Sequence, residues 1–265
     1  MINEKNVSYK LLNKEDFLLN KMILAAALCA TTTFAAVDRF AVLENHKGEL
    51  SFGSNFTKQG EHKDLIFDIQ SRYTILPNLE LGMTLPYDVS LDKDHLNGLM
   101  TPFLSARYQF IPSLRAFLSV GVPTMVGPYS SWVFDFGIQE SQKWGLVNLG
   151  SFLGLEVETE GEDNISSPMS LNFGVETIFD LGVVNPFVCA NGTMKIGKYE
   201  GKLTDAIRVN EDVSGHVGVW LSAGVIVAIN SDVEVSAGVG TAVGKEDVVG
   251  HDRLINVSLG LKVAI

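Results

Sequence analysis

The stretch INVSLGLKVAI, residues 255–265, alternates apolar side chains with small or polar ones to the end of the chain. Its apolar positions are Ile255, Val257, Leu259, Leu261, Val263 and Ile265. Because successive side chains of a β-strand point to opposite faces, this alternation predicts a strand with one apolar and one polar face. We expect Leu259 to lie on the apolar face and Ser258 on the polar face.

The same two-residue period recurs from Leu50 onward, and no stretch keeps a 3.6-residue period for two turns. Twelve segments fit a strand, near residues 49–56, 64–75, 79–87, 100–111, 114–123, 131–140, 144–157, 168–179, 183–195, 213–229, 232–243 and 252–265. Long connections are expected at 57–63, 88–99, 124–130, 158–167, 196–212 and 244–251, and short ones at 76–78, 112–113, 141–143, 180–182 and 230–231. Their strict alternation indicates an up-and-down meander.

The composition narrows the class of protein. Of 265 residues, 46% are hydrophobic and 19% are charged, against a usual charged share of roughly 25%. The net charge of −11 argues against a nucleic-acid partner, because phosphate contacts need clustered Lys and Arg. In a soluble barrel the apolar face would point inward, and the apolar side chains of twelve strands would be difficult to pack within its limited interior. In an outer-membrane barrel that face meets lipid, and closure leaves no unpaired strand edge.

We therefore predict an all-β fold, a closed antiparallel up-and-down transmembrane β-barrel of about 12 strands in the outer membrane of a Gram-negative cell. The N-terminal run MILAAALCA, Met22 to Ala30, follows Lys21 and precedes small residues, as in a secretory signal peptide. We expect a signal peptide over 1–36, a barrel over 37–265 and a mature chain that starts at Ala36 or Val37. Residues before Met22 form a long n-region, so Met22 is an alternative start. A buried core helix is the other reading of this run.

Charged residues on the polar strand faces are the candidate site. They should line the lumen and form an eyelet: Asp68, Arg72, Glu80, Arg107, Arg115, Asp135, Glu156 and Glu176. Arg72 and Glu80 flank one short turn and can pair, whereas Arg107 and Arg115 flank the next turn as like charges. Such a ring either selects small solutes by its transverse field or merely plugs the interior with salt bridges.

The last eight residues, SLGLKVAI, resemble the C-terminal β-signal of outer-membrane barrels. Ser258, Gly260, Val263 and Ile265 fit that pattern, although bacterial versions usually end in an aromatic residue. The resemblance implies assembly by the barrel-assembly machinery into outer-membrane lipid. The tract YTILPNLELGMTLPY, residues 73–87, is similar to a hairpin in the transporter family named for the MetA pathway of phenol degradation. This second resemblance implies passage of small, partly apolar compounds and assigns no site residues.

An enzyme or metal site finds little support in the residues. The sequence contains no HExxH, GxSxG, CxxC or Walker motif, and a hydrolase centre at His251 and Asp252 on the barrel rim is a distant alternative. Two acidic groups lack the Asp, Asn and Gly spacing of a calcium loop: Glu156, Glu158, Glu160, Glu162 and Asp163, and Asp88, Asp92 and Asp94. We expect no catalysis, cofactor or metal.

Two functions remain for a monomeric barrel. The first is passive or facilitated passage of small solutes through the lumen. The second is a plugged structural or surface-interaction barrel that acts through acidic extracellular loops.

Overall fold

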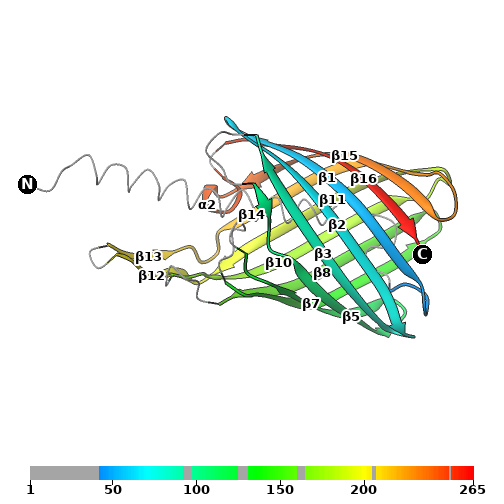
Figure 1. Ribbon diagram of the computed structural model, residues 1–265, viewed down its shortest axis with the longest axis horizontal. Helices are drawn as coiled ribbons and strands as arrows, with labels where there is room; N and C mark the ends of the chain where they lie inside the picture. The colour runs from blue at the N-terminus through cyan, green and yellow to red at the C-terminus, as the bar shows by residue number, and fades with distance from the viewer. Residues whose placement is uncertain (1–41, 92–96, 125–130, 160–164, 205–206, 251) are drawn as a thin grey trace, which may run out of the picture.

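Twelve long antiparallel strands form a closed barrel in the computed structural model, which describes residues 42–91, 97–124, 131–159, 165–204, 207–250 and 252–265. These strands are β1 (Gly48–Gln59), β2 (His62–Leu76), β3 (Leu79–Ser90), β5 (Phe103–Ile111), β6 (Leu114–Gly121), β7 (Val133–Trp144), β8 (Val147–Glu158), β10 (Met169–Phe179), β11 (Val184–Ile196), β14 (Val217–Ala228), β15 (Val233–Gly244) and β16 (Leu254–Ala264). Each pairs with its neighbour in the chain, and β1 pairs with β16 to close the barrel (Figure 1). The predicted fold class is confirmed, whereas the predicted signal peptide lies outside the described residues.

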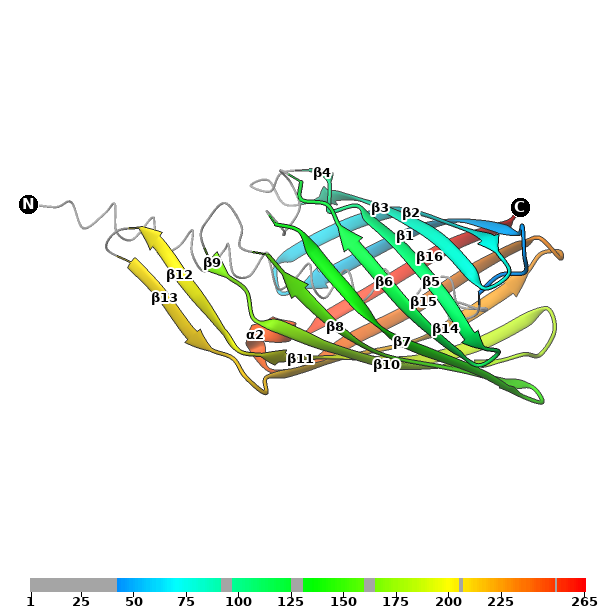
Figure 2. The same ribbon diagram turned by 90° about the horizontal axis from the view of Figure 1, so that it is seen from below.

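Shorter elements lie in the long connections. They are β4 (Gly98–Leu99), β9 (Ile165–Ser166), β12 (Lys198–Thr204), β13 (Ile207–Asp212) and the helix α2 (Glu246–Val249). Strands β13, β12 and β9 form a separate sheet, and the β12–β13 hairpin projects beyond the barrel wall (Figure 2). The expectation of a loop over 196–212 was therefore wrong. A hairpin outside the hydrocarbon layer needs no apolar face, so it lacks the alternation that marks the barrel strands.

In the described part of the chain, no helix has both the length and the apolar character needed to cross a membrane.

Two connections differ from the prediction. Strands β1 and β2 are joined by residues 60–61 alone, where a long connection over 57–63 was expected. The turn between β7 and β8 lies at 145–146 rather than at 141–143. Gly60 and Gly145 both have φ of +60°, a conformation that glycine adopts without strain and that tight hairpin turns require. The polar residues around these turns continue the strands instead of ending them.

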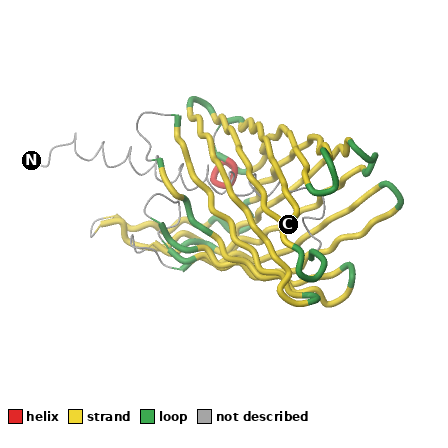
Figure 3. Tube along the Cα trace, turned by 45° about the vertical axis from the view of Figure 1, so that its right-hand side comes forward, coloured by secondary structure: helices red, strands yellow, loops and turns green. Residues whose placement is uncertain are grey.

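The two ends of the barrel are different. Residues 77–78, 112–113, 145–146, 180–183 and 229–232 connect strands at one end, which we call the short-turn end. The C-terminus also lies there, because Ile265 and Gly48 exchange backbone hydrogen bonds of 2.8 and 2.9 Å. The turn at residues 60–61 and the helix α2 lie at the opposite or long-loop end (Figure 3).

The barrel is apolar outside and polar inside. Along β16, Leu259 is 57% exposed and Ser258 is 1% exposed, so the predicted faces of this strand are confirmed. The interior buries Asn55, Thr57, Asn191 and many other polar side chains, while large apolar residues on every barrel strand point outward. Soluble proteins show the reverse order. An apolar outer surface over polar lumen residues is the arrangement of a barrel surrounded by hydrocarbon.

Candidate functional site: the barrel lumen

Six neighbouring strands each place one charged side chain on the inner wall near the short-turn end. In strand order β15, β16, β1, β2, β3 and β5, these residues are Glu234, Lys262, Glu49, Arg72, Glu80 and Arg107, which we call the charge ladder. Acids and bases alternate along it. The barrel's closure brings them together, because the ladder crosses the seam between the first and last strands.

The seam half of the ladder is centred on Lys262. Its Nζ lies 2.6 Å from Glu234 Oε2 and 3.8 Å from Glu49 Oε2. The strand register accounts for these contacts. Glu234 on β15 faces Lys262 directly, and Glu49 on β1 is a diagonal neighbour of Lys262. Glu49 is 6% exposed, so a cation beside it offsets the cost of burying the carboxylate.

The other half is centred on Glu80, which is 2% exposed. Arg72 contacts Glu49 (Nη2–Oε2, 2.9 Å) and Glu80 (Nη1–Oε2, 3.6 Å), and Arg107 Nη1 lies 3.2 Å from Glu80 Oε1. The predicted pairing of Arg72 with Glu80 is confirmed. A cavity of about 60 Å³ adjoins this half of the ladder, with Ser51 and Gln70 also in its lining.

The chain before β1 joins the same site. The backbone N–H of Leu43 donates to Glu80 Oε2 at 3.1 Å, and Thr74 Oγ1 donates to the Leu43 carbonyl at 3.0 Å. The His46 N–H also donates to the Thr74 carbonyl at 3.1 Å. His46 therefore stays beside β2, whereas Leu43 lies over the inward side chains of β2 and β3. Three segments of the chain thus contact Glu80.

All eight predicted lumen residues lie on the inward face of their strands, as the burial pattern of each strand shows. The structure joins three of them, Arg72, Glu80 and Arg107, in the ladder. Five lie outside it: Asp68, Arg115, Asp135, Glu156 and Glu176. The eight candidates did not include Glu49, Glu234 and Lys262, although the parity of their positions places each of them inward.

Arg107 and Arg115 have different partners, although they lie on neighbouring strands. Arg107 binds Glu80, and Arg115 Nη2 donates to the Pro112 carbonyl at 3.2 Å. On β7 and β8, Asp135 and Glu156 face each other directly. The wall opposite the seam therefore carries acidic residues, whereas the ladder balances three acids with three bases.

The polar contacts continue from Glu156 across the next two strands. Asn172 Nδ2 lies 3.5 Å from Glu156 Oε2, and Thr193 Oγ1 donates to Asn172 Oδ1 at 2.7 Å. Beside them, Lys195 Nζ donates to Ser170 Oγ at 2.9 Å. These bonds fix the side chains of β8, β10 and β11 on the inner wall.

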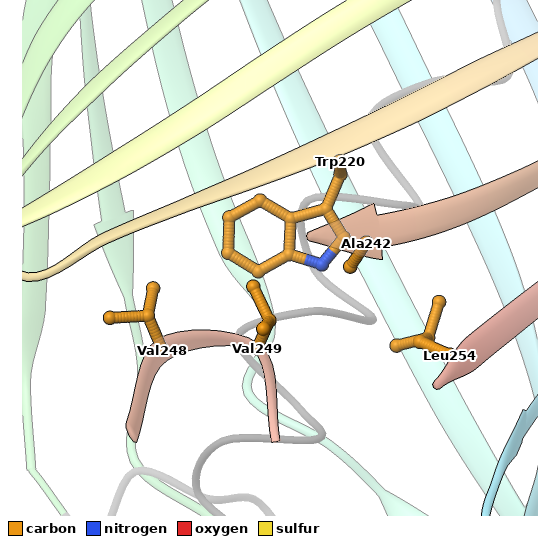
Figure 4. Packing of buried hydrophobic residues seen from close by; sticks show 5 residues of the cluster. All are labelled: Trp220, Ala242, Val248, Val249 and Leu254. Atoms are coloured by element: carbon orange, nitrogen blue, oxygen red, sulfur yellow. The ribbon is translucent and has the colours of Figure 1, made fainter. Parts of the chain in front are cut away.

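The long-loop end holds an apolar cluster inside the barrel mouth. Its members are Trp220, Ala242, Val248, Val249 and Leu254, which are at most 8% exposed (Figure 4). Val248 and Val249 of α2 lie against Gly218 of β14, where a Cβ would come within 2.6 and 2.5 Å of their methyl carbons. We call residues 245–253 the α2 loop.

Polar contacts attach the α2 loop to the barrel. Gln59 Nε2, at the end of β1, donates to the carbonyls of Val249 at 2.6 Å and Asp252 at 2.9 Å. His216 Nδ1 lies 2.5 Å from Asp247 Oδ2 on the other side of the loop. The loop is therefore held from β1 and from the segment before β14.

The substitution Gln59→Ala should release the α2 loop, because it removes two hydrogen bonds worth about 0.5–1.5 kcal/mol each. Trypsin should then cleave after Lys245 or Arg253 about fivefold faster or more. Mass spectrometry of timed digests of the folded barrel measures this rate. Gln142→Ala, at the short-turn end, is the control and should leave it unchanged. Equal rates in all three proteins would show that Gln59 does not hold the loop.

The acidic groups noted in the sequence lie partly within and partly outside the described residues. Among residues with a described position, no group of three or more His, Cys, Asp or Glu side chains is arranged to hold a metal ion. Several residues of the acidic groups lie outside the described part, namely Asp92, Asp94, Glu160, Glu162 and Asp163, as does the rim residue His251.

These features define the class: a transmembrane β-barrel with an apolar outer surface and a charged, polar lumen. No protein-family model matches the chain, and no curated protein matches it in sequence. In fold it is similar to an outer membrane channel from Pseudomonas putida F1, with a TM-score of 0.63 at 11% identity over 87% of this chain and 100% of that one. The NanC porin gives 0.58 at 6% identity, covering 81% and 98% of the two chains.

The translocator domain of the autotransporter NalP from Neisseria meningitidis gives a TM-score of 0.53 at 11% identity, over 93% of this chain and 98% of that one. These likenesses agree with the closed barrel and its apolar surface, and they show that the chain has the fold of outer-membrane β-barrels.

Proposed function

We propose that the barrel mediates the passive or facilitated passage of small solutes across the outer membrane. The observation that carries this proposal is the charged inner wall, where the ladder holds alternating acids and bases along one side of the lumen. An interior that served only as packing could be filled by neutral side chains. Rings of fixed charges are the means by which pores select solutes. Two of the similar folds are also named as a channel and a porin.

The solutes that suit this lumen are small and partly apolar. Ile178, Phe187 and Ile226 on β10, β11 and β14 form a buried apolar patch on the inner wall. The Phe187 ring lies over Gly224 and Gly238, where added Cβ atoms would come within 2.7 and 3.2 Å of it. These three side chains are at most 4% exposed, so they fill the wall, and the proposal of partly apolar solutes rests on the resemblance of residues 73–87 rather than on this patch.

The eyelet function of the eight predicted lumen residues remains part of this proposal. We place its centre at Arg72, Glu80 and Arg107, because their side chains border the cavity at the short-turn end. Asp68, Arg115, Asp135, Glu156 and Glu176 would act elsewhere along the lumen.

Export and assembly complete the proposal. Residues 1–36 would be removed as a signal peptide, leaving a barrel over 37–265 that inserts as a monomer. Ser258, Gly260, Val263 and Ile265 would be recognised by the barrel-assembly machinery.

A surface-interaction barrel is the second candidate. The β12–β13 hairpin favours it, because this hairpin projects beyond the barrel at the long-loop end and pairs with β9 rather than with a barrel strand.

Planar-bilayer recording separates the two candidates. The purified, folded barrel should give discrete conductance steps, and a heat-unfolded sample of the same preparation should give none. Liposomes that contain the barrel should swell faster in small aromatic glycosides than in sugars of similar mass, and liposomes without protein should swell in neither. A folded barrel that gives neither conductance nor swelling would favour the surface-interaction candidate.

A further inference from the structure

Asp68 and Asn55 lie side by side on the inner wall, farther from the short-turn end than the charge ladder. Asp68 on β2 faces Gly53 on β1, and Asn55 is the next inward residue after Gly53. A Cβ at Gly53 would lie 2.2 Å from Asp68 Oδ2, so the carboxyl group occupies the space above this glycine. Diagonal neighbours of this kind lie about 7–8 Å apart, which allows one small guest to contact both side chains.

These two side chains have hydrogen-bonding capacity to spare. Gln70 Nε2 donates to Asp68 Oδ1 at 2.9 Å. Within the described residues, Asp68 Oδ2 and both polar atoms of the Asn55 amide have no hydrogen-bond partner. Asp68 is 2% exposed and Asn55 is 0% exposed. Buried polar atoms in native proteins are nearly always paired, so these three atoms indicate a bound water or ligand.

The chemistry of the pair favours a cation. Among the described residues, no ion pair joins Asp68 to a basic side chain. The three bases of the charge ladder contact the acids of the ladder instead. A carboxylate oxygen and an amide oxygen are hard acceptors that suit an alkali ion or the N–H groups of an ammonium ion. A single carboxylate suits a monovalent ion better than Ca²⁺, whose binding strengthens with the number of charged ligands.

We propose that Asp68 and Asn55 form a binding site for a small monovalent cation, either an alkali ion or a primary ammonium group. The site also makes the barrel pass cations in preference to anions. This selectivity rests on the proposed passage of solutes, whereas the binding of the cation does not.

Selectivity is tested by the reversal potential of the reconstituted barrel in asymmetric KCl at pH 8. The parent should prefer K⁺ to Cl⁻, and Asp68→Asn should lower the permeability ratio by about threefold or more. Asp232→Asn is the matched control, because it removes one carboxylate from an exposed turn at the short-turn end and should leave the ratio unchanged. Asn55→Ser, which keeps every charge, repeats the test if Asp68→Asn does not fold.

Binding is tested without conduction by the melting temperature of the folded barrel in detergent. Methylammonium chloride should raise it by about 2–4 °C at several times the dissociation constant, relative to N-methylglucamine chloride at equal ionic strength. Asp68→Asn should lose this shift and Asp232→Asn should keep it.

The two measurements have separate outcomes. A conducting parent that prefers chloride, or a K⁺ preference and melting shift that both survive Asp68→Asn, would overturn the cation site. A parent without conductance would contradict the proposed passage, and the melting shift alone would then decide whether the cation site exists.

Discussion

Leu259→Arg should remove most of the folded barrel from the outer membrane. Leu259 lies in the middle of β16 and is 57% exposed on the apolar outer surface of the barrel, so an arginine there would face hydrocarbon. A cation at the lipid-facing midplane of a barrel costs roughly 2–4 kcal/mol. The yield of heat-modifiable barrel in membrane fractions measures the loss.

Leu259→Phe is the matched control, since it keeps an apolar side chain at the same position, and its yield should stay near that of the parent. Lys262, three residues further on, already shows that this strand carries a cation on its inner face. Ser258→Arg is a poorer comparison than the sequence suggests, because Ser258 is 1% exposed and its Oγ donates to the Gly238 carbonyl. Equal yields for the Arg and Phe variants would mean that the faces are assigned wrongly.

Glu80→Ala should destabilise the folded barrel by about 3–5 kcal/mol, the range measured when one partner of a buried ion pair is removed. Glu80 accepts hydrogen bonds from Arg107 and from the Leu43 N–H and forms an ion pair with Arg72, and its side chain is 2% exposed. Its loss would leave two guanidinium groups near the short-turn end with fewer partners. The free energy of unfolding, from urea titration in lipid vesicles, measures the effect.

Asp180→Ala is the control for this prediction. Asp180 lies in the turn after β10 at the same end of the barrel, and its carboxylate forms an exposed ion pair of 2.7 Å with Lys143. Exposed substitutions of this kind usually change stability by less than about 0.5 kcal/mol. If both variants lost the same stability, the ladder would contribute nothing specific to the barrel.

The sequence predicted the barrel strands well because lipid and lumen impose a period of two on every strand that crosses the membrane. Residues 255–265 show this period, and the structure keeps Leu259 outward and Ser258 inward. The prediction was wrong for residues 198–204 and 207–212, which form a hairpin outside the barrel. It was also wrong at 57–63 and 141–143, where polar residues extend the strands up to Gly60 and Gly145.

The candidate site was predictable in part for the same reason. Parity places all eight candidates, and also Glu49 and Lys262, on the inner wall. Arg72 and Glu80 flank one tight turn, so their pairing follows from the local sequence. The contact between Lys262 and Glu49 does not, because these residues lie near opposite ends of the barrel sequence.

The sequence by itself therefore determined the number of barrel strands and their approximate positions, which face of each strand meets lipid and which charges enter the lumen. Only the tertiary structure decided which charges are neighbours. Closure of β1 on β16 and the register of each strand pair set the height of every side chain along the barrel axis. A one-residue change of register would reverse the faces of a strand, so the alternation of each strand restricts its register. The local sequence does not indicate which distant strand pairs with β1 to close the barrel. The charge ladder and the Asp68–Asn55 site are products of that closure and register.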